Sequence, residues 1–257
     1  MRAIALPLSL LFAFFLYPVF PSFSVLLTRG LRALYARVLL LFTRKSGHAD
    51  SRPAICVLLL LLGGAAALLG AVHPLLGAVA AAPVFTGLAL LPGCARAKDE
   101  LDSGAYAKDR EGYETLVRDT CLPLGPAFAA DVCTPLLLGA LGTPLYLGVS
   151  LCWCYAALRA LCDTDADARR ICTLLLRPAD AALRFLLTLL APLFGRSLLH
   201  ARGRRSGERL MYILGIAGDE RDTHPPMAGD ITQAVFLCCF AALLLTGALT
   251  LTLMVIL

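Results

Sequence analysis

The sequence predicts an all-α integral membrane protein, a helical bundle with about four to six membrane segments. Hydrophobic residues make up 59% of the 257 residues and charged residues 16%, and the mean hydropathy is +0.78. A soluble domain of this size needs a more polar surface. Four long runs contain no Asp, Glu, Lys or Arg, namely 3–28, 53–95, 132–158 and 231–257. About 20 apolar residues cross a bilayer as a helix, so each run is long enough to span it.

We treat the chain as a single membrane domain, residues 1–257. Its first apolar segment has the position of a secretory signal, but it is too long for one, prolines interrupt it and no small-residue cleavage site follows, so we expect a retained span. The next two segments form a hairpin that turns at His73-Pro74. The segment at 178–195 is weaker, because it is short and contains Arg184. The predicted membrane segments are 3–28, 54–72, 74–93, 132–158, 178–195 and 231–257.

The polar segments predict the orientation. Arg and Lys dominate 29–52 and the start of 196–230, which the positive-inside rule places in the cytoplasm. A hairpin over 54–93 returns the chain to the same side, so 96–131 is cytoplasmic too. We therefore expect a multi-pass protein of the cell (inner) membrane. The side of 159–180 stays open, because 132–158 either crosses once or turns back as a re-entrant hairpin near Gly142-Thr143-Pro144.

Residues 28–45 have the periodicity of an amphipathic helix. Apolar residues recur at three- and four-residue steps, and the arginines fall largely elsewhere on the helical wheel. This pattern predicts an interfacial helix on an anionic leaflet, so the lipid bilayer is an expected partner. No compact basic domain with interleaved aromatic residues occurs, so we expect no nucleic-acid partner. The apolar positions are Leu31, Leu34, Val38 and Leu41, and the basic ones are Arg29, Arg32, Arg37 and Arg44.

The stretch 114–147, ETLVRDTCLPLGPAFAADVCTPLLLGALGTPLYL, combines a polar entrance with an apolar run that Pro and Gly break repeatedly. Such breaks free backbone groups, and membranes tolerate them where protein or a watery cavity covers them. Arg118, Asp119 and Asp131 stand at the entrance, and an ionisable residue at membrane depth indicates a functional site. Position alone favours ordinary interfacial charges for Arg118 and Asp119, and is evenly balanced for Asp131.

The ten cysteines predict no metal centre. Most lie in apolar runs, where a free Cys behaves as a small hydrophobic residue. Neither Cys152-Trp153-Cys154 nor Cys238-Cys239 has the spacing and the nearby His of a zinc site. The sequence also contains no Walker loop, dinucleotide fingerprint, zinc-protease helix or nucleophile elbow.

Two central stretches carry a family resemblance. AYAKDREGYETLVRDT, residues 105–120, resembles the helix and Gly-Arg-Asp-Thr element of the CobD/CbiB family, with Val117 in place of the Gly. FAADVCTPLLLGALGTPLYL, residues 128–147, resembles the family's following segment, with its Asp, its Pro-Leu run and its Gly-x-Pro turn. The matching positions are Asp131, Pro135, Leu136, Gly142 and Pro144.

The ends of the chain extend this resemblance. Residues 17–40 are similar to the family's His-Pro-Val segment, with Tyr17 in place of His. Residues 175–194 are similar to a segment with an Asp pair and Pro-Ala-Arg, of which Asp180 and Arg184 remain. Residues 218–245 are similar to the start of the last span, with Asp230 matched. The likeness covers most of the chain in order, through short motifs.

The resemblance implies a function in cobalamin biosynthesis. The family consists of adenosylcobinamide-phosphate synthases, which join an aminopropanol or its phosphate to adenosylcobyric acid through an amide. It implies a corrinoid substrate, ATP and Mg²⁺, with homo-oligomers or other cobalamin-pathway membrane proteins as further partners. On this basis Arg118, Asp119 and Asp131 are the catalytic candidates, and Asp119 and Asp131 the metal ligands. The candidates for substrate binding are Thr120, Asp180, Arg184 and Asp230.

Departures from the family pattern leave the activity open. Ala129 and Ala130 replace the family's Glu and Asn before Asp131, and the family's Asn-Thr-Leu-Asp element has no counterpart at 146–161. The chain contains no Asn. Mg²⁺ prefers carboxylate and phosphate oxygens, which these losses make fewer. Two alternatives to the ligase follow: a non-catalytic membrane relative that acts as scaffold or assembly partner, and a small transporter with broken helices.

Overall fold

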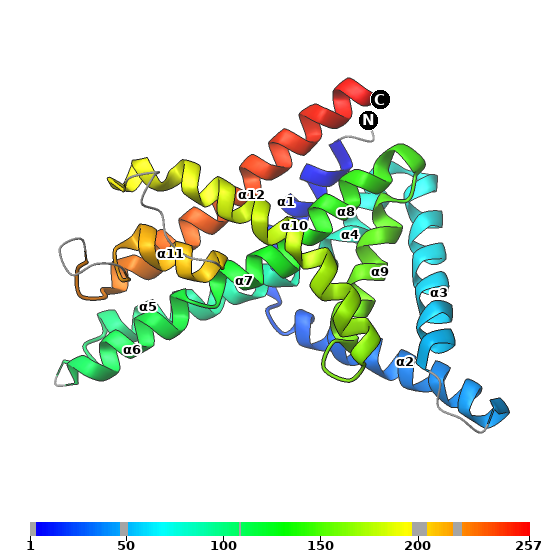
Figure 1. The fold of residues 1–257 in the computed structure, drawn as a ribbon, viewed down its shortest axis with the longest axis horizontal. Coiled ribbons are helices and arrows are strands. Elements are labelled where there is room, and N and C mark those ends of the chain that lie inside the picture. Colours follow the sequence, from blue (N-terminus) through cyan, green and yellow to red (C-terminus); the bar gives the residue numbers. More distant parts are fainter. Residues whose placement is uncertain (1–3, 47–50, 108, 197–204, 218–222) are drawn as a thin grey trace. The chain divides into compact units, whose positions relative to one another are not determined.

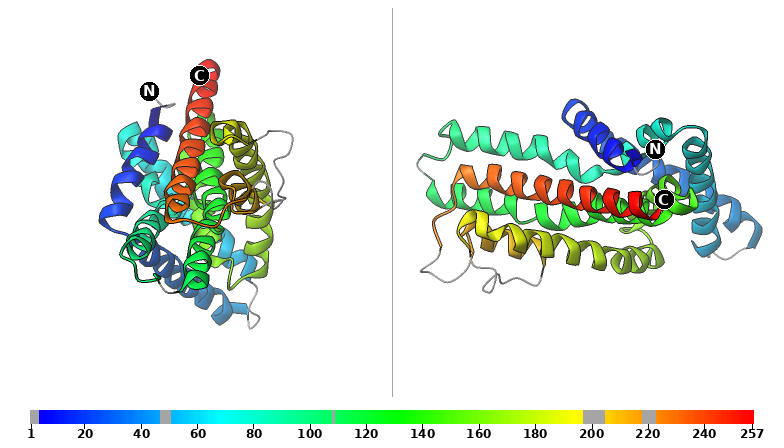
Figure 2. Two further views of the ribbon diagram at one scale, coloured as in Figure 1. Left: turned by 90° about the vertical axis from the view of Figure 1, so that its left-hand side faces the viewer. Right: turned by 90° about the horizontal axis from the view of Figure 1, so that it is seen from above.

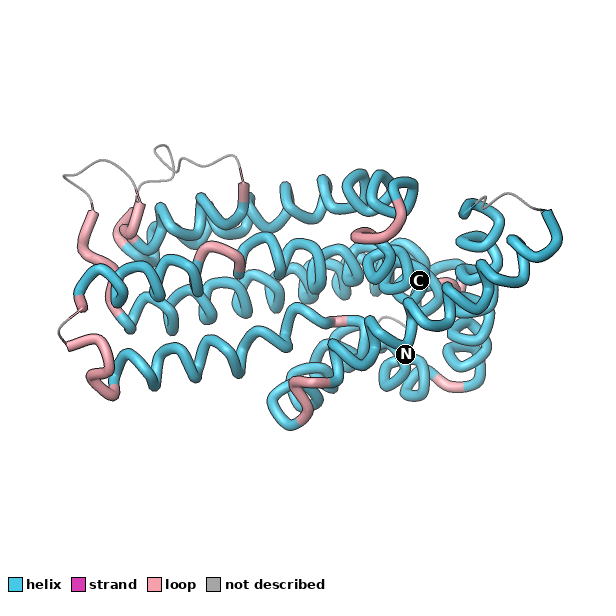
Figure 3. Tube along the Cα trace, turned by 90° about the horizontal axis from the view of Figure 1, so that it is seen from below, coloured by secondary structure: helices cyan, strands magenta, loops and turns pink. Residues whose placement is uncertain are grey.

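The computed structural model describes residues 4–46, 51–107, 109–196, 205–217 and 223–257. In these ranges the chain forms helices and no strands (Figure 3), which confirms the all-α class. The predicted polar segments 29–52 and 196–230 lie partly outside the described residues. The chain divides into two compact units. Unit 1 comprises 1–86, 134–177 and 246–257, and unit 2 comprises 87–133 and 178–245.

Several described helices are long and apolar enough to cross a membrane. Three qualify singly: α3 (Ser51–Val72), the helical run Arg110–Leu145 and α12 (Ala228–Ile256). Two bent helix pairs raise the number to five if each pair is one span. The structure therefore offers three to five candidate spans, a range that overlaps the predicted four to six. The predicted segment 178–195 is not among these helices, because it belongs to the longer helix α10 (Ala166–Leu190), which carries several charged side chains.

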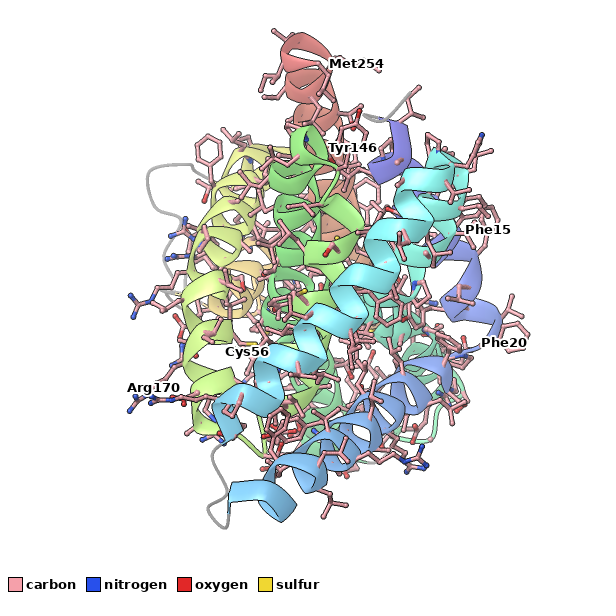
Figure 4. All side chains as sticks on the ribbon, turned by 90° about the vertical axis from the view of Figure 1, so that its right-hand side faces the viewer. Phe15, Phe20, Cys56, Tyr146, Arg170 and Met254 are labelled. Atoms are coloured by element: carbon pink, nitrogen blue, oxygen red, sulfur yellow. The ribbon has the colours of Figure 1, made fainter. Side chains whose placement is uncertain are left out.

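Unit 1 contains the first predicted segment, which is bent and not a single straight helix. Helix α1 (Ala5–Val19) and helix α2 (Phe23–Ser46) meet at an angle of 104°. Pro18 and Pro21 flank the bend, where a proline removes a backbone donor. The Tyr17 hydroxyl donates a hydrogen bond to the Pro83 carbonyl, so buried contacts fix the end of α1. Figure 4 shows Phe15 and Phe20, near this bend, pointing outward.

Helix α2 confirms that 28–45 is helical, and its apolar face packs largely on protein. Leu31, Tyr35 and Val38 are buried, in clusters with residues of α3 and α9 (Gly148–Leu161). Leu41 is 69% exposed. Protein rather than a lipid leaflet therefore covers most of the predicted apolar stripe.

The hairpin at His73-Pro74 is present. Helix α3 ends at Val72, and α4 (Pro74–Ala81) begins at Pro74, followed by the 3-10 turn η2 (Ala82–Val84). The His73 ring caps α4, since its Nδ1 accepts a hydrogen bond from the Leu75 backbone N–H at 3.2 Å. A proline at the first position of a helix loses no intrahelical bond, which favours this boundary.

A second hairpin joins α8 (Thr134–Gly142) to α9 (Figure 1). The 3-10 turn η5 (Thr143–Leu145) and Tyr146 reverse the chain, with Tyr146 at φ 61°. The two helices run antiparallel, because Cys152 Sγ reaches the Pro135 carbonyl at 3.3 Å while Gly148 lies beside Gly139. A β-carbon on Gly148 would lie 2.7 Å from the Gly139 carbonyl oxygen, so this approach needs glycine. Residues 134–161 therefore turn back.

Unit 2 is built from short helices and parts of two long ones. Helix α12, a long unbroken helix in Figure 2, contributes its residues up to Leu245, and α10 contributes those from Pro178. Gly125 and Gly207 let α7 and α11 approach closely, since a β-carbon on Gly125 would lie 2.6 Å from the Gly207 nitrogen. The other elements are η3 (Thr86–Leu90), α5 (Leu91–Asp102), α6 (Arg110–Cys121), α7 (Leu124–Phe128), the π-helical turn η4 (Ala129–Cys133), η6 (Ala191–Phe194) and α11 (Ser206–Leu214).

Candidate functional site

All seven residues predicted for the site lie in unit 2. They come from four elements, α6, η4, α10 and α12, and their surroundings differ from one element to the next. They are Arg118, Asp119, Thr120, Asp131, Asp180, Arg184 and Asp230.

Arg118 and Asp119 lie in the last turn of α6, and both are exposed. Thr120 is half-buried, and its hydroxyl donates a hydrogen bond to the Leu116 carbonyl at 2.7 Å within the same helix. A cation near a helix C-terminus interacts favourably with the helix dipole, which accounts for Arg118. The Arg-Asp-Thr element is thus a solvated helix end in this structure.

Asp131 has more unusual surroundings, because it lies in the π-helical turn η4. It is half-buried between the buried residues Ala130 and Val132. A β-carbon on Gly87 would lie 3.3 Å from Asp131 Cβ, so η3 packs tightly against this turn. Single π turns widen a helix locally and occur frequently at functional sites. The prolines and glycines around Asp131 therefore do not end the helical run, which has one π-helical turn at Asp131.

A polar cluster forms between α10 and α11, and we call it the α10–α11 cluster: Asp180, Arg184, Thr188, Ser206 and Arg209. Arg184 Nε lies 3.0 Å from an Asp180 carboxylate oxygen, one helical turn away. The other oxygen accepts a hydrogen bond from the Ser206 backbone N–H at 3.3 Å, at the start of α11. Arg209 Nη1 donates to the Thr188 hydroxyl at 2.6 Å. The structure thus brings together two predicted residues and three that the sequence did not indicate.

Burial gives this cluster its electrostatic character. Burial and the positive charge of Arg184 lower the pKa of Arg209, against the opposing effect of Asp180. The Ser206 side chain is fully buried, and its hydroxyl has no hydrogen-bond partner within the described ranges. Arg184 thus pairs with a carboxylate at the start of a helix, a position that stabilises negative charge, and the same carboxylate acts on the charge of Arg209.

Asp230 caps the start of α12 and is buried within unit 2. It is 2% exposed and is the third residue of the helix. Its carboxylate reaches back to the Met227 backbone N–H at 2.7 Å, which is one half of a capping box. His224 Nε2 lies 3.7 Å from the carboxylate and 2.8 Å from the Leu214 carbonyl oxygen. The Tyr113 hydroxyl accepts a hydrogen bond from the neighbouring Ala228 N–H at 2.9 Å. The contacts of Asp230 therefore stabilise the start of α12.

The predicted metal ligands do not fit one ion. Asp119 and Asp131 are 12 residues apart in the helical run Arg110–Leu145, a separation of about 18 Å along a helix axis. Mg²⁺ holds its oxygen ligands at about 2.1 Å, so two carboxylates of one site must lie side by side. Among the described residues no group of three or more His, Cys, Asp or Glu side chains could hold a metal ion.

Three further acidic residues, at the turn between α9 and α10 in unit 1, have structural partners. Asp163 pairs with Arg32 at 2.5 Å and Asp167 with Arg52 at 2.8 Å. Asp165 is buried and caps α10, accepting hydrogen bonds from the Asp167 and Ala168 backbone N–H groups at 2.9 Å each. Burial opposes ionisation of Asp165, but these donors and the hydroxyls of Ser51 and Tyr35 lower its pKa overall.

Sequence reasoning missed Tyr113, Ser206 and Arg209. Arg209 was visible as the last of the basic residues that open the segment 196–230, but no pattern paired it with α10. Tyr113 has no sequence signal beyond its place in the polar helix. Comparisons with family models, with curated proteins and with solved structures found no match for this chain.

Proposed function

We propose that the chain acts at the membrane in cobalamin biosynthesis as a non-catalytic relative of the adenosylcobinamide-phosphate synthases, a scaffold or assembly partner for the corrinoid pathway. The corrinoid link rests on the resemblance of residues 105–147. The non-catalytic role rests on the dispersal of the carboxylates in unit 2. An amide ligation with ATP and Mg²⁺ usually holds the ion with one or two carboxylates together with phosphate oxygens, so two acids that serve one ion lie close together.

The dispersal of the carboxylates is the observation that carries the proposal. Asp119 is exposed on α6, Asp180 binds Arg184 and the start of α11, and Asp230 caps α12. Of the four acids that the resemblance selects, Asp180 and Asp230 already stabilise helix starts, and Asp119 is exposed. Asp131 lies in the π-helical turn η4.

The π-helical turn favours a second candidate, the amide ligase itself. Asp131 in η4 would be its principal acidic group, and ATP and Mg²⁺ would be its cofactors. In that case carboxyl activation of the corrinoid would use phosphate oxygens of the nucleotide to complete the metal site. The acids of this chain would then supply one ligand rather than a pair.

Genetic complementation separates the two candidates. The chain is expressed in a cobalamin-dependent strain that lacks its synthase, beside Asp131→Ala and, as a matched control, the exposed Asp119→Ala. The non-catalytic role predicts no growth with any of the three, despite confirmed expression in the membrane. Growth with the wild type that Asp131→Ala abolishes and Asp119→Ala preserves would establish the ligase instead.

A co-purification experiment tests the proposed role as an assembly partner. In a strain with an intact synthase, the tagged chain should co-purify with corrinoid-pathway membrane proteins after mild solubilisation. Substitutions in the α10–α11 cluster test whether that cluster takes part, with Arg184→Ala beside Arg177→Ala, an arginine of the same helix. Co-purification that no member of the pathway enters would contradict the assembly role.

A further inference from the structure

Unit 1 contains a cavity of about 730 Å³ that the proposed function does not use. Helices α1, α3, α4, α8 and α9 form its wall together with the last residues of α12. All of these residues belong to unit 1. The volume lies within the range of about 300–1,000 Å³ that is usual for small-molecule sites in proteins.

Small side chains create the space. Gly70 and Gly77 come from α3 and α4, Gly139 and Gly148 from the second hairpin, and alanines lie between them. A β-carbon on Gly77 would lie 3.1 Å from Gly70 Cα, so the helices approach as closely as glycine allows. The floor reaches the interior, since Ser9, Ala78 and Cys152 are each 2% exposed or less.

The wall of the cavity is mainly apolar. None of the lining residues is charged. The Ser9 hydroxyl donates to the Leu6 carbonyl within α1, and the Thr143 hydroxyl of η5 donates to the Gly139 carbonyl of α8, at 2.7 Å each. The Cys152 thiol is turned toward the Pro135 carbonyl. These groups therefore offer little to a polar ligand, whereas an apolar chain would find continuous contact.

The rim of the cavity is apolar as well. Ile4, Tyr146, Met254 and Leu257 line it and are 43% to 56% exposed. Figure 4 shows Tyr146 and Met254 at the same end of the unit. The wall includes residues of α3 and α12, two of the helices apolar enough to cross a membrane. These lining residues come from the last turns of both helices, so the opening lies near one end of the spans when the helices lie in a bilayer.

We propose that this cavity binds the acyl chain of a membrane phospholipid. The cavity has the volume of a small-molecule site, no charged side chain lines it, and two of the helices around it are apolar enough to cross a membrane. A single hydrocarbon chain is narrow and flexible enough to enter. The bilayer supplies such chains at high concentration beside the rim.

The only tryptophan of the chain is placed to report this binding. Trp153 follows the cavity residue Cys152, and its indole N–H donates to the Ala80 carbonyl at 2.8 Å, between the cavity residues Ala78 and Ala81. Bromine atoms on a lipid chain quench indole emission at short range. A brominated chain in the cavity therefore quenches Trp153.

The experiment compares two substitutions on one helix. The full chain is reconstituted into phosphatidylcholine vesicles with an increasing fraction of brominated-chain lipid. Gly70→Leu places a side chain in the cavity, where a β-carbon meets only Val149 at ordinary contact distance, 3.4 Å. Gly64→Leu adds the same side chain on α3 where nothing lies within 4 Å, away from the cavity. Ala71→Leu is a second filling variant in case Gly70→Leu does not fold, with helicity by circular dichroism as the check.

The wild type and Gly64→Leu should show quenching that saturates at a low fraction of brominated lipid. In Gly70→Leu and Ala71→Leu, the added side chain removes space for about two methylene groups. The affinity that the saturating quenching reports should therefore fall about tenfold. Quenching that rises in simple proportion to the brominated fraction, identically in all variants, would show contact with surrounding lipid alone and overturn the proposal. Absence of quenching, with cross-linking between copies at Tyr146 or Met254, would assign the rim to a second copy and overturn it as well.

Discussion

Four acidic residues, two in each unit, have different structural roles. In unit 1, Asp163 and Asp167 pair with arginines of α2 and α3 at exposed positions. In unit 2, Asp180 and Asp230 bind the starts of α11 and α12, and Asp230 is almost fully buried. Exposed ion pairs contribute little to stability, whereas a buried acceptor whose donors would otherwise be unpaired contributes much. The first two acids thus join helices weakly, and the other two fix helix ends.

We expect the largest loss of stability from the replacement of Asp230. Asp230→Ala removes the buried carboxylate that accepts the hydrogen bond of the Met227 N–H, which should cost about 1–3 kcal/mol of unfolding free energy. Thermal unfolding in detergent, followed by circular dichroism, measures it. Asp119→Ala is the control, because Asp119 is exposed and its loss should change stability by less than about 0.5 kcal/mol. Equal effects of the two substitutions would contradict the capping role.

Asp165 is the exception within unit 1, since it is buried and caps α10. Asp165→Ala should cost about 1 kcal/mol, the usual effect of losing an N-cap side chain. Because the folded state lowers the pKa of Asp165, its ionised form stabilises the fold above the ordinary pKa of 3.8. That contribution fades as the pH falls below 3.8.

The pH dependence has a matched variant. Asp165→Asn keeps a capping oxygen but does not titrate, so its unfolding temperature should lose less than that of the wild type as the pH falls below 3.8. Parallel pH curves for the two proteins would show that the carboxylate charge does not stabilise the cap.

The exposed pair Arg52–Asp167 tests how little an ion pair of unit 1 contributes to stability. The two side chains are 75% and 31% exposed. A double-mutant cycle with Arg52→Ala and Asp167→Ala should give a coupling of about 0.5 kcal/mol, which falls as salt is added. A coupling above about 2 kcal/mol, insensitive to salt, would mean that unit 1 also depends on desolvated charge pairs.

The smallest effect concerns the thiol of Cys162, at the end of α9. A hydrogen bond with Cys172 and the positive charge of Arg159 lower the pKa of Cys162 to about 7, against the effect of burial. Alkylation should therefore rise with a midpoint near pH 7 and change stability little, because the thiolate is the reactive form. Arg159→Ala should move the midpoint upward. A midpoint at the ordinary value of 9.0 would contradict these contacts, and Cys162→Ser identifies the labelled site.

Uncharged runs, prolines and glycines made much of the fold predictable. His73-Pro74 marked a helix boundary, because a capping side chain and a proline at the first position both favour helix initiation. The bend between α1 and α2 was missed although Pro18 and Pro21 stand beside it. Apolar content does not reveal a change of helix direction. The apolar stripe of α2 was read correctly as helical, but periodicity does not tell whether lipid or protein covers it.

The candidate site was less predictable, because its contacts join residues that are distant in the chain. Asp180 and Arg184 are one helical turn apart, so their pairing follows from sequence. Their neighbours Ser206 and Arg209 arrive from another helix, and nothing local to either stretch indicates that contact. Asp131 was singled out by its position beside an apolar run. The π turn that surrounds it became visible only in the structure.

One assay tests directly our proposal that the chain takes part in corrinoid metabolism without joining the amide. The purified chain is incubated with adenosylcobyric acid, aminopropanol phosphate, ATP and Mg²⁺, and retained corrinoid and amide product are measured in the same sample. We expect corrinoid retained with the protein and no amide above a protein-free control. Amide formed in repeated turnovers would contradict the non-catalytic role, and the absence of retained corrinoid would contradict the corrinoid link.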